Sequence, residues 1–309
     1  MWQAQCIGGA LPPQGDSPPA LAYISRALAV YPSLTANDQQ ALKTFINTLY
    51  NHDNGILWNK FSFLMVTGPD PSQSETSGQF MGGMNAINLV TNSSNFFVSR
   101  NTGSHNINTP YHGWSNGLSG DDSYQIYNFN PSTDSLYTTS SAHMSIWINT
   151  PISTNNFPIM GFYDGSGSTP SVGYASLSPA GNPATTLFGM NDRGSGTSGG
   201  YWVPNGTTTT PNGHGFHLVT RNNNQVDLYW NDQGSVANYT TTPIVPLGTM
   251  PFVVNNNYTY NLGGIQNVGC QCEWAMISAG AGFSASDELT LYNATKTLFS
   301  NSAWGGPYG

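Results

Sequence analysis

The chain is dominated by short β-prone runs, which lie between Gly78 and Ser278 and are separated by clusters of Gly, Pro and Asn. In the run HMSIWIN at residues 143–149, alternation places Met144, Ile146 and Ile148 on one face of a strand. Helical segments do not alternate with these runs, which argues against parallel βαβ units. The pattern therefore predicts a mainly β fold in which two antiparallel sheets pack as a sandwich.

Two of these runs are joined by the sequence RNNN at residues 221–224. The run before it places Phe216 and Leu218 on one face, and the run after it aligns Val226 with Leu228. Asn adopts left-handed backbone geometry more readily than most residues do. We therefore expect a tight hairpin at this position.

Two similar phrases predict a helix at each end of the β region: SLTANDQQALKTFINTLYN at residues 33–51 and GAGFSASDELTLYNATKTLFSN at residues 280–301. Thr35 and Ser284 stand where an N-cap hydroxyl satisfies a free backbone N–H, and Asp38 and Asp287 follow in the first turn. Two generic amphipathic helices that agree in register are the alternative to a matched pair. Helices this short need a partner, so we expect both to dock on the sandwich, the first through Leu42, Phe45, Ile46 and Leu49.

The N-terminal residues contain several prolines, at Pro12-Pro13, Pro18-Pro19 and Pro32. Because proline interrupts regular structure, residues 1–33 are predicted to form an attachment arm that contains one or two helical turns. Residues 34–303 then form the sandwich with its two helices, and residues 304–309 form a short tail.

Charged residues are scarce and mostly acidic: they make up 7% of the chain, and the net charge is −8. Phosphate-backbone binding needs clustered Lys and Arg, so nucleic acid is excluded as a partner. No run approaches the ~18 apolar residues of a membrane span. The first basic residue is Arg26, so a signal-peptide charge region is not expected either.

The order of several short motifs resembles virion structural proteins of bacteriophages and related viruses that carry a concanavalin A-like, laminin-G-like sandwich. The matching stretches are LWNKF at 57–61, NPST at 130–133, LYWND at 228–232, GFSASDE at 282–288, and Leu291-Tyr292. Phe283 departs from the usual Leu, and residues 1–33 lie outside the likeness. No single motif is strongly specific, so the order and spacing of the set carry the likeness.

The resemblance implies a concanavalin A-like jelly roll that serves as a surface fibre, decoration or tail component of a particle made in the host cytoplasm. On this interpretation the chain contacts other virion proteins through residues 1–33 and forms a homo-oligomer. The resemblance brings no catalytic residues.

A glycan-binding adhesin is the alternative function. Aromatic rings beside Asn and Asp offer stacking and directional hydrogen bonds to a sugar on the host surface. The candidate rings are Trp114, Tyr201, Trp202 and Tyr229. The competing interpretation is that most of these rings belong to the core.

The scarcity of paired carboxylates predicts that the chain is not an enzyme. A polysaccharide hydrolase is the third and least favoured functional hypothesis. Glycoside hydrolysis needs two carboxylates across the sugar, but the chain has only Glu75, Glu273 and Glu288, spread over unrelated segments. Asp121-Asp122 reads as a solvated turn.

No metal or other cofactor is predicted. Cys270 and Cys272 are interpreted as small thiols buried in the core. With Cys6 the chain has three cysteines, and an odd number argues against a disulfide framework. His214 and His217 are three residues apart, which sends them to opposite faces of a strand. Asp164 and Asp192 lie in Gly-rich stretches, but they lack the alternating ligands of a calcium loop.

Overall fold

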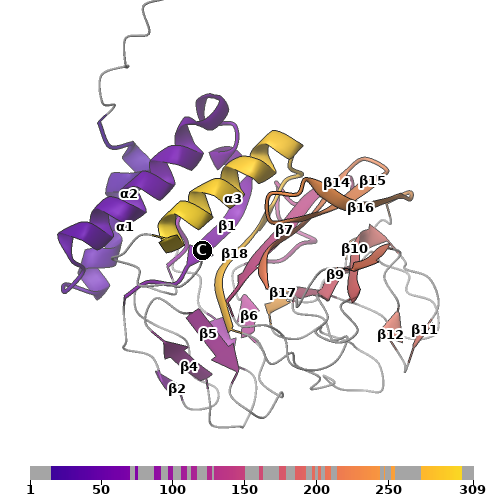
Figure 1. Cartoon of the computed structure of the whole chain (residues 1–309), viewed down its shortest axis with the longest axis horizontal. Helices are drawn as coiled ribbons and strands as arrows, with labels where there is room; N and C mark the ends of the chain where they lie inside the picture. The colour runs from indigo at the N-terminus through magenta and orange to yellow at the C-terminus, as the bar shows by residue number, and fades with distance from the viewer. Residues whose placement is uncertain are drawn as a thin grey trace, which may run out of the picture.

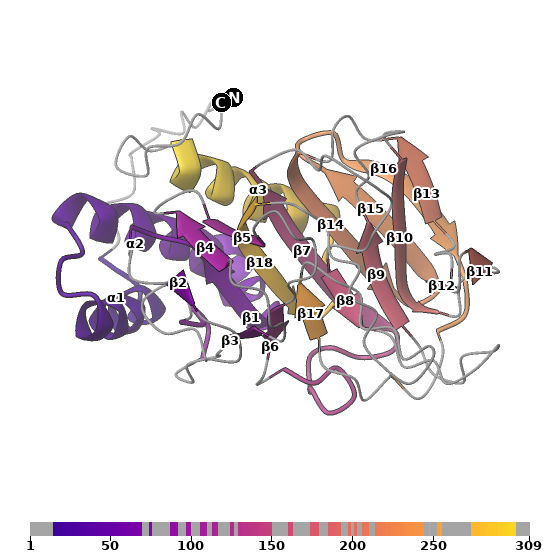
Figure 2. The ribbon, with the colours of Figure 1, turned by 90° about the horizontal axis from the view of Figure 1, so that it is seen from below.

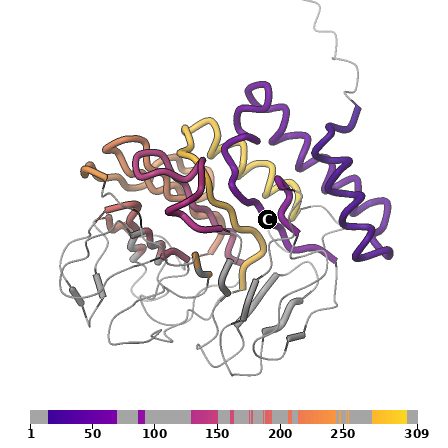
Figure 3. The backbone as a smooth tube through the Cα atoms, turned by 180° about the vertical axis from the view of Figure 1, so that it is seen from behind, coloured from indigo at the N-terminus to yellow at the C-terminus, as the bar shows by residue number. Residues whose placement is uncertain are grey.

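The computed structural model describes residues 15–69, 74–75, 87–91, 97–99, 106–109, 113–116, 124–126, 129–149, 160–162, 174–178, 185–192, 197–198, 201–202, 206–209, 214–243, 247, 252–254 and 273–300. Figure 3 traces the backbone, with the three helices and the long strands of the larger sheet in colour. Within these residues the chain is mainly β, and the predicted two-sheet antiparallel sandwich is confirmed.

The larger sheet contains nine strands among the described residues, all paired antiparallel. Its order is β16-β15-β14-β7-β18-β5-β4-β2, and β1 also pairs with β18. The strands are β1 (Phe61–Val66), β2 (Ser74–Glu75), β4 (Asn106–Thr109), β5 (Gly113–Asn116), β7 (Ser141–Ile148), β14 (Gly215–Asn222), β15 (Gln225–Trp230), β16 (Ser235–Thr240) and β18 (Glu273–Gly280).

The smaller sheet contains seven strands in the described part, in the order β13-β10-β9-β8-β17-β6-β3, and it faces the larger sheet (Figure 2). These strands are β3 (Phe97–Ser99), β6 (Tyr124–Ile126), β8 (Met160–Phe162), β9 (Tyr174–Ser178), β10 (Thr185–Asp192), β13 (Gly206–Thr209) and β17 (Phe252–Val254). A separate ladder joins β11 (Thr197–Ser198) to β12 (Tyr201–Trp202).

The hydrophobic residues between the two sheets form what we call the sandwich core. The larger sheet supplies Met144, Ile146 and Ile148 from β7, as their alternation predicted. The smaller sheet supplies residues that include Phe162, Leu177, Phe188, Phe252 and Val254. All of these side chains are fully buried, so the alternation on β7 identified the correct inner face.

The expected hairpin joins β14 to β15. Asn222 pairs with Gln225, and Asn223 in the turn has a φ of 54°. Asn is one of the few residues other than Gly that enters this left-handed region readily, which explains the Asn run.

Three helices cover the outer face of the larger sheet (Figure 1): α1 (Pro18–Val30), α2 (Ala36–Asn51) and α3 (Ala285–Ser300). The apolar residues between this layer and the sheet form the helix-facing core, in which α2 places Leu42, Phe45, Ile46 and Leu49. The two predicted helices, α2 and α3, are therefore present and docked. Two short 3-10 turns, η1 (His52–Gly55) and η2 (Trp58–Lys60), lead from α2 into β1.

Helix α1 changes the expected boundary of the N-terminal arm. Pro18 and Pro19 occupy the first two positions of the helix, where no intrahelical N–H is needed, and Ser17 accepts a hydrogen bond from Ala20 N as the N-cap. Tyr23 is fully buried in the helix-facing core. Residues 17–30 therefore belong to the folded domain, whereas residues 1–14 and 304–309 lie outside the described residues.

Candidate functional site

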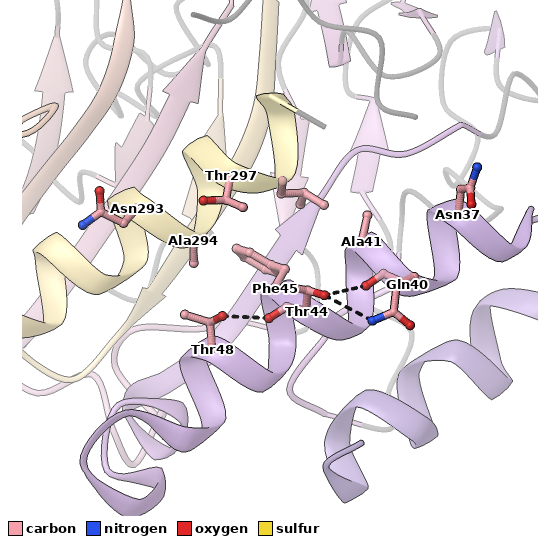
Figure 4. Close-up of a pocket in the computed structure, with 10 residues that line it drawn as sticks. Asn37, Gln40, Ala41, Thr44, Phe45, Thr48, Asn293, Ala294 and Thr297 are labelled. Atoms are coloured by element: carbon pink, nitrogen blue, oxygen red, sulfur yellow. Dashed lines mark hydrogen bonds between the residues drawn. The ribbon is translucent and has the colours of Figure 1, made fainter. Parts of the chain in front are cut away.

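A groove of about 420 Å³ lies between α2 and α3 on the outer surface of the helix layer (Figure 4). Its floor is apolar and buried, and the small side chains of Ala41 and Ala294 leave the space open between the larger Phe45 and Leu298. Its walls are exposed and polar: Asn37, Gln40, Thr44 and Thr48 come from α2, and Asn293 and Thr297 come from α3. The volume falls within the ~300–1,000 Å³ typical of ligand sites.

The polar walls offer both donors and acceptors. Thr44 Oγ1 donates to Gln40 O at 2.9 Å and Thr48 Oγ1 donates to Thr44 O at 2.8 Å, so both hydroxyl protons are committed (Figure 4). Thr44 Oγ1 also accepts from Gln40 Nε2 at 3.4 Å, whereas Thr48 Oγ1 can accept from a ligand. Within the described part of the chain, the side-chain amides of Asn37 and Asn293 make no hydrogen bond. An amide has two donors and an acceptor, so the groove can match a ligand rich in hydroxyl groups.

Among the described residues, no ionisable side chain lines the groove. An ionic ligand would therefore have to be desolvated without a counter-charge, which is costly. The chemistry of these walls suits an uncharged polar ligand.

Two capping boxes fix where the helices that form the groove begin. In α2, Thr35 Oγ1 accepts from Asp38 N while Asp38 Oδ2 accepts from Thr35 N. In α3, Ser284 Oγ accepts from Asp287 N and Asp287 Oδ2 accepts from Ser284 N. The two caps predicted from the sequence are thus both formed.

A group of ionisable side chains joins the end of α2 to the start of α3. Lys60 Nζ lies 2.6 Å from Asp287 Oδ2, and His52 Nε2 lies 3.7 Å from Asp287 Oδ1. Burial alone would raise the pKa of Asp287, but the hydrogen bonds from Lys60 and Ser284 outweigh burial and hold this pKa below its usual value. Gly280 permits the approach of this segment, because a Cβ there would clash with the Lys60 carbonyl oxygen.

Glu288, one residue further along α3, is 2% exposed, and its Oε1 has no hydrogen-bond partner among the described residues. Burial, together with the negative charge of Asp232, raises the pKa of Glu288 to about 8. This carboxyl is therefore mostly protonated at neutral pH.

The predicted sugar-stacking rings are not brought together by the described residues. Tyr229 on β15 is only 6% exposed and packs in the helix-facing core, so its assignment to an exposed glycan face is wrong. Trp114 lies on β5, paired with Trp274, and Tyr201 and Trp202 form β12. The side chains of these three residues lie outside the described residues.

The other candidate residues are scattered. Glu273 begins β18, and the Glu75 side chain, Asp121-Asp122, Asp164 and all three cysteines lie outside the described residues. Asp192 is 1% exposed and accepts a hydrogen bond from the Tyr239 hydroxyl, with Arg221 Nη2 at 3.7 Å, so it is not free for calcium. His217 is fully buried within β14.

Sequence reasoning missed the groove, although one signal was available. Thr48-Leu49 and Thr297-Leu298 occupy equivalent places in the two helical phrases, and Thr48 and Thr297 face the same space. These equivalent threonines mark one face of each helix, but only the fold shows that the two faces adjoin.

Comparison with known proteins gives likenesses in structure only: no family model and no curated protein matches the chain. Trypanosoma rangeli sialidase with a covalently bound difluorosialic acid is 10% identical, with a TM-score of 0.47, over 85% of this chain and 40% of that chain. A mutant of the same sialidase with trans-sialidase activity is 12% identical, with a TM-score of 0.45. Domain 4 of an extracellular arabinanase from Geobacillus stearothermophilus, in complex with arabinotriose, is 15% identical, with a TM-score of 0.39, over 80% of this chain and 94% of that chain.

These likenesses correct one prediction from the sequence. The sequence led to the prediction that this chain is not an enzyme. That prediction is contradicted, because glycoside hydrolases are among the similar structures. The chain spans about 40% of the sialidase length. At these identities and TM-scores the likenesses assign no activity to this chain.

Proposed function

We propose that this protein binds a neutral glycan in the groove between α2 and α3. The observation that carries the proposal is the make-up of the groove, which combines uncharged hydroxyl and amide walls with a narrow apolar floor. Sugar hydroxyls both donate and accept hydrogen bonds, and the apolar C–H faces of a sugar can rest on the alanines of the floor.

The affinity expected for one site is modest. Phe45 is 2% exposed and lies at the bottom of the groove, so it offers little ring surface for stacking. Hydrogen bonds that replace bonds to water contribute only ~0.5–1.5 kcal/mol each. Several copies of the groove in one assembly would raise the apparent affinity without new contacts.

A glycan array with the purified full chain tests this proposal, provided it carries neutral and acidic oligosaccharides side by side. We expect binding to neutral glycans, weakened by about ten-fold in a Gln40→Ala/Asn293→Ala double variant that removes two wall amides. The matched control is Asn51→Ala, which removes an exposed amide at the last residue of α2, outside the groove. Binding confined to acidic glycans, or equal binding by the double variant, would overturn the proposal.

We propose further that the chain performs this function on a virus particle, as a surface fibre, decoration or tail component. Support comes from the motif order: the LWNKF segment forms the joint from α2 into β1, and the GFSASDE segment starts the closing helix. In this proposal the protein is a homo-oligomer held to other virion proteins by its N-terminal segment.

Helix α1 sharpens the test of attachment. Deleting residues 1–33 would also remove α1 from the helix-facing core, so loss of incorporation could then reflect misfolding. Deleting residues 1–14 leaves the described domain intact. We expect particles to exclude this shorter variant, and equal incorporation of the truncated and full chains would contradict an attachment role.

A further inference from the structure

Three potential metal ligands converge where α2 ends and α3 begins. One ligand atom each from His52, Asp53 and Asp287 lies within 4.8 Å of the other two. His52 Nε2 is 3.4 Å from Asp53 Oδ2 and 3.7 Å from Asp287 Oδ1. Ligands around a tetrahedral Zn²⁺ at ~2.1 Å lie roughly 3.4 Å apart, so the two measured distances are close to those of a zinc site.

The hydrogen bonds of Thr290 indicate which ring nitrogen of His52 carries the proton in the neutral form. Thr290 Oγ1 donates its only proton to Ser286 O at 2.8 Å, so it must accept from His52 Nδ1, which lies 3.2 Å away. In the neutral ring the proton is therefore on Nδ1, and the lone pair of Nε2 faces Asp53 Oδ2 and Asp287 Oδ1, with the Ser286 hydroxyl 3.5 Å away. A histidine that is held by a hydrogen bond through its other nitrogen is typical of metal sites.

The carboxylates are positioned for the same role. Asp287 is 1% exposed, and its Oδ2 is occupied by Lys60 and Ser284, which leaves Oδ1 on the side of His52. Asp53 is 59% exposed in its side chain, so it can rotate to complete the contact. Lys60 neutralises one of the two carboxylates, and a divalent ion would offset the negative charge that is left.

We propose that His52, Asp53 and Asp287 bind one Zn²⁺, with a fourth position open to water. One imidazole and two carboxylates suit zinc among the common divalent ions, since calcium and magnesium prefer oxygen ligands alone. The ion links the end of α2 to the start of α3 and thereby holds together the two helices that form the groove.

Calorimetric titration of the metal-depleted full chain with Zn²⁺ at neutral pH tests the site. We expect one Zn²⁺ per chain and at least about ten-fold weaker binding for both His52→Gln and Asp53→Asn. His214→Gln and Asp232→Asn are the matched controls, because each removes the same chemical group at a described position outside this cluster, and both should bind like the unaltered chain.

Substitution with Co²⁺ adds a spectroscopic readout, because a four-coordinate ion with imidazole and carboxylate ligands absorbs in the visible range and the signal should be lost in His52→Gln. Two results would overturn the proposal. The first is no Zn²⁺ binding by the unaltered chain. The second is unchanged binding by both variants, which would place the ion elsewhere, for example on Cys270 and Cys272.

Discussion

The starts of α2 and α3 share one local design but differ in their surroundings. Each begins with a hydroxyl N-cap and an aspartate that close a capping box, and Asp38 and Asp287 are both 1% exposed. Asp287 in addition binds Lys60 and faces His52. The residue that follows is Gln39 in α2, whereas in α3 it is the buried Glu288.

This difference teaches what local sequence can and cannot encode. Four consecutive residues encode each capping box, so the same motif can start a helix near either end of the chain. The charge environment of α3 depends on Lys60, which is 227 positions away from Asp287 in the sequence. The start of α3 thus carries a long-range electrostatic contact that its local sequence does not encode.

The largest expected effect concerns a feature that the two helices share. Leu42 and Leu291 occupy equivalent positions and are both fully buried in the helix-facing core. Leu42→Ala and Leu291→Ala should each lower the free energy of unfolding by about 3 kcal/mol, because each leaves a cavity. Urea unfolding measures both; a loss below about 1 kcal/mol for Leu42→Ala would mean that α2 is not part of the cooperative fold.

The next effect is pH dependence that only α3 should show. The pKa of Glu288 is raised to about 8 in the folded chain, above its unfolded value, so the folded state holds the extra proton between these values. Stability from this group is therefore present at low pH and is lost as pH rises, by roughly 2–3 kcal/mol between pH 5 and 7.

Glu288→Gln, which copies Gln39 of α2, should remove this slope. Urea midpoints of the variant and the unaltered chain at pH 5, 6 and 7 make the comparison. Parallel pH profiles for the two proteins would refute the assignment.

Removing the capping carboxylates separates the shared cap from the long-range contacts. Asp38→Ala should cost about 1 kcal/mol, the typical value of a cap. Asp287→Ala should cost 1–2 kcal/mol more, roughly, because it also leaves the partly buried Lys60 without its counter-charge. Thermal or urea unfolding gives both values, and equal losses would show that the Lys60 contact contributes nothing.

The smallest effect lies in the groove, at another matched pair. Thr48 already donates to the Thr44 carbonyl, whereas within the described part of the chain the Thr297 hydroxyl makes no hydrogen bond. Thr297→Val should therefore weaken glycan binding by about three- to ten-fold, and Thr48→Val by less. The dissociation constants of the two variants for the same neutral glycan are compared. A larger loss of affinity for Thr48→Val than for Thr297→Val would reverse the assigned roles.

Much of the fold could be predicted from the sequence, since alternation and capping act over a few residues. The inner face of β7, the hairpin at Asn223 and both caps follow from such patterns. The length of helix α1 was underestimated, as one or two turns, because Pro18 and Pro19 were taken as breakers, although proline is well tolerated in the first turn. Tyr229 was misplaced because both faces of β15 are covered, so alternation does not distinguish core from surface.

The candidate sites were out of reach for a different reason. The groove combines residues of α2 and α3, and the His52 cluster combines residues of η1 and α3. Only the tertiary fold brings these distant segments together. A hydroxyl or amide on a helix surface has no distinguishing local pattern, because such residues are common on any solvated face.

Side-chain amide NMR signals in the groove test the central claim most directly. The full chain, labelled with ¹⁵N, is titrated with the neutral oligosaccharide that binds best on the array, and the signals of Asn37, Gln40 and Asn293 are followed beside that of Asn51. The account predicts saturable shifts of the three groove amides with Asn51 unchanged. Saturable binding that leaves all three groove amides unshifted would contradict it.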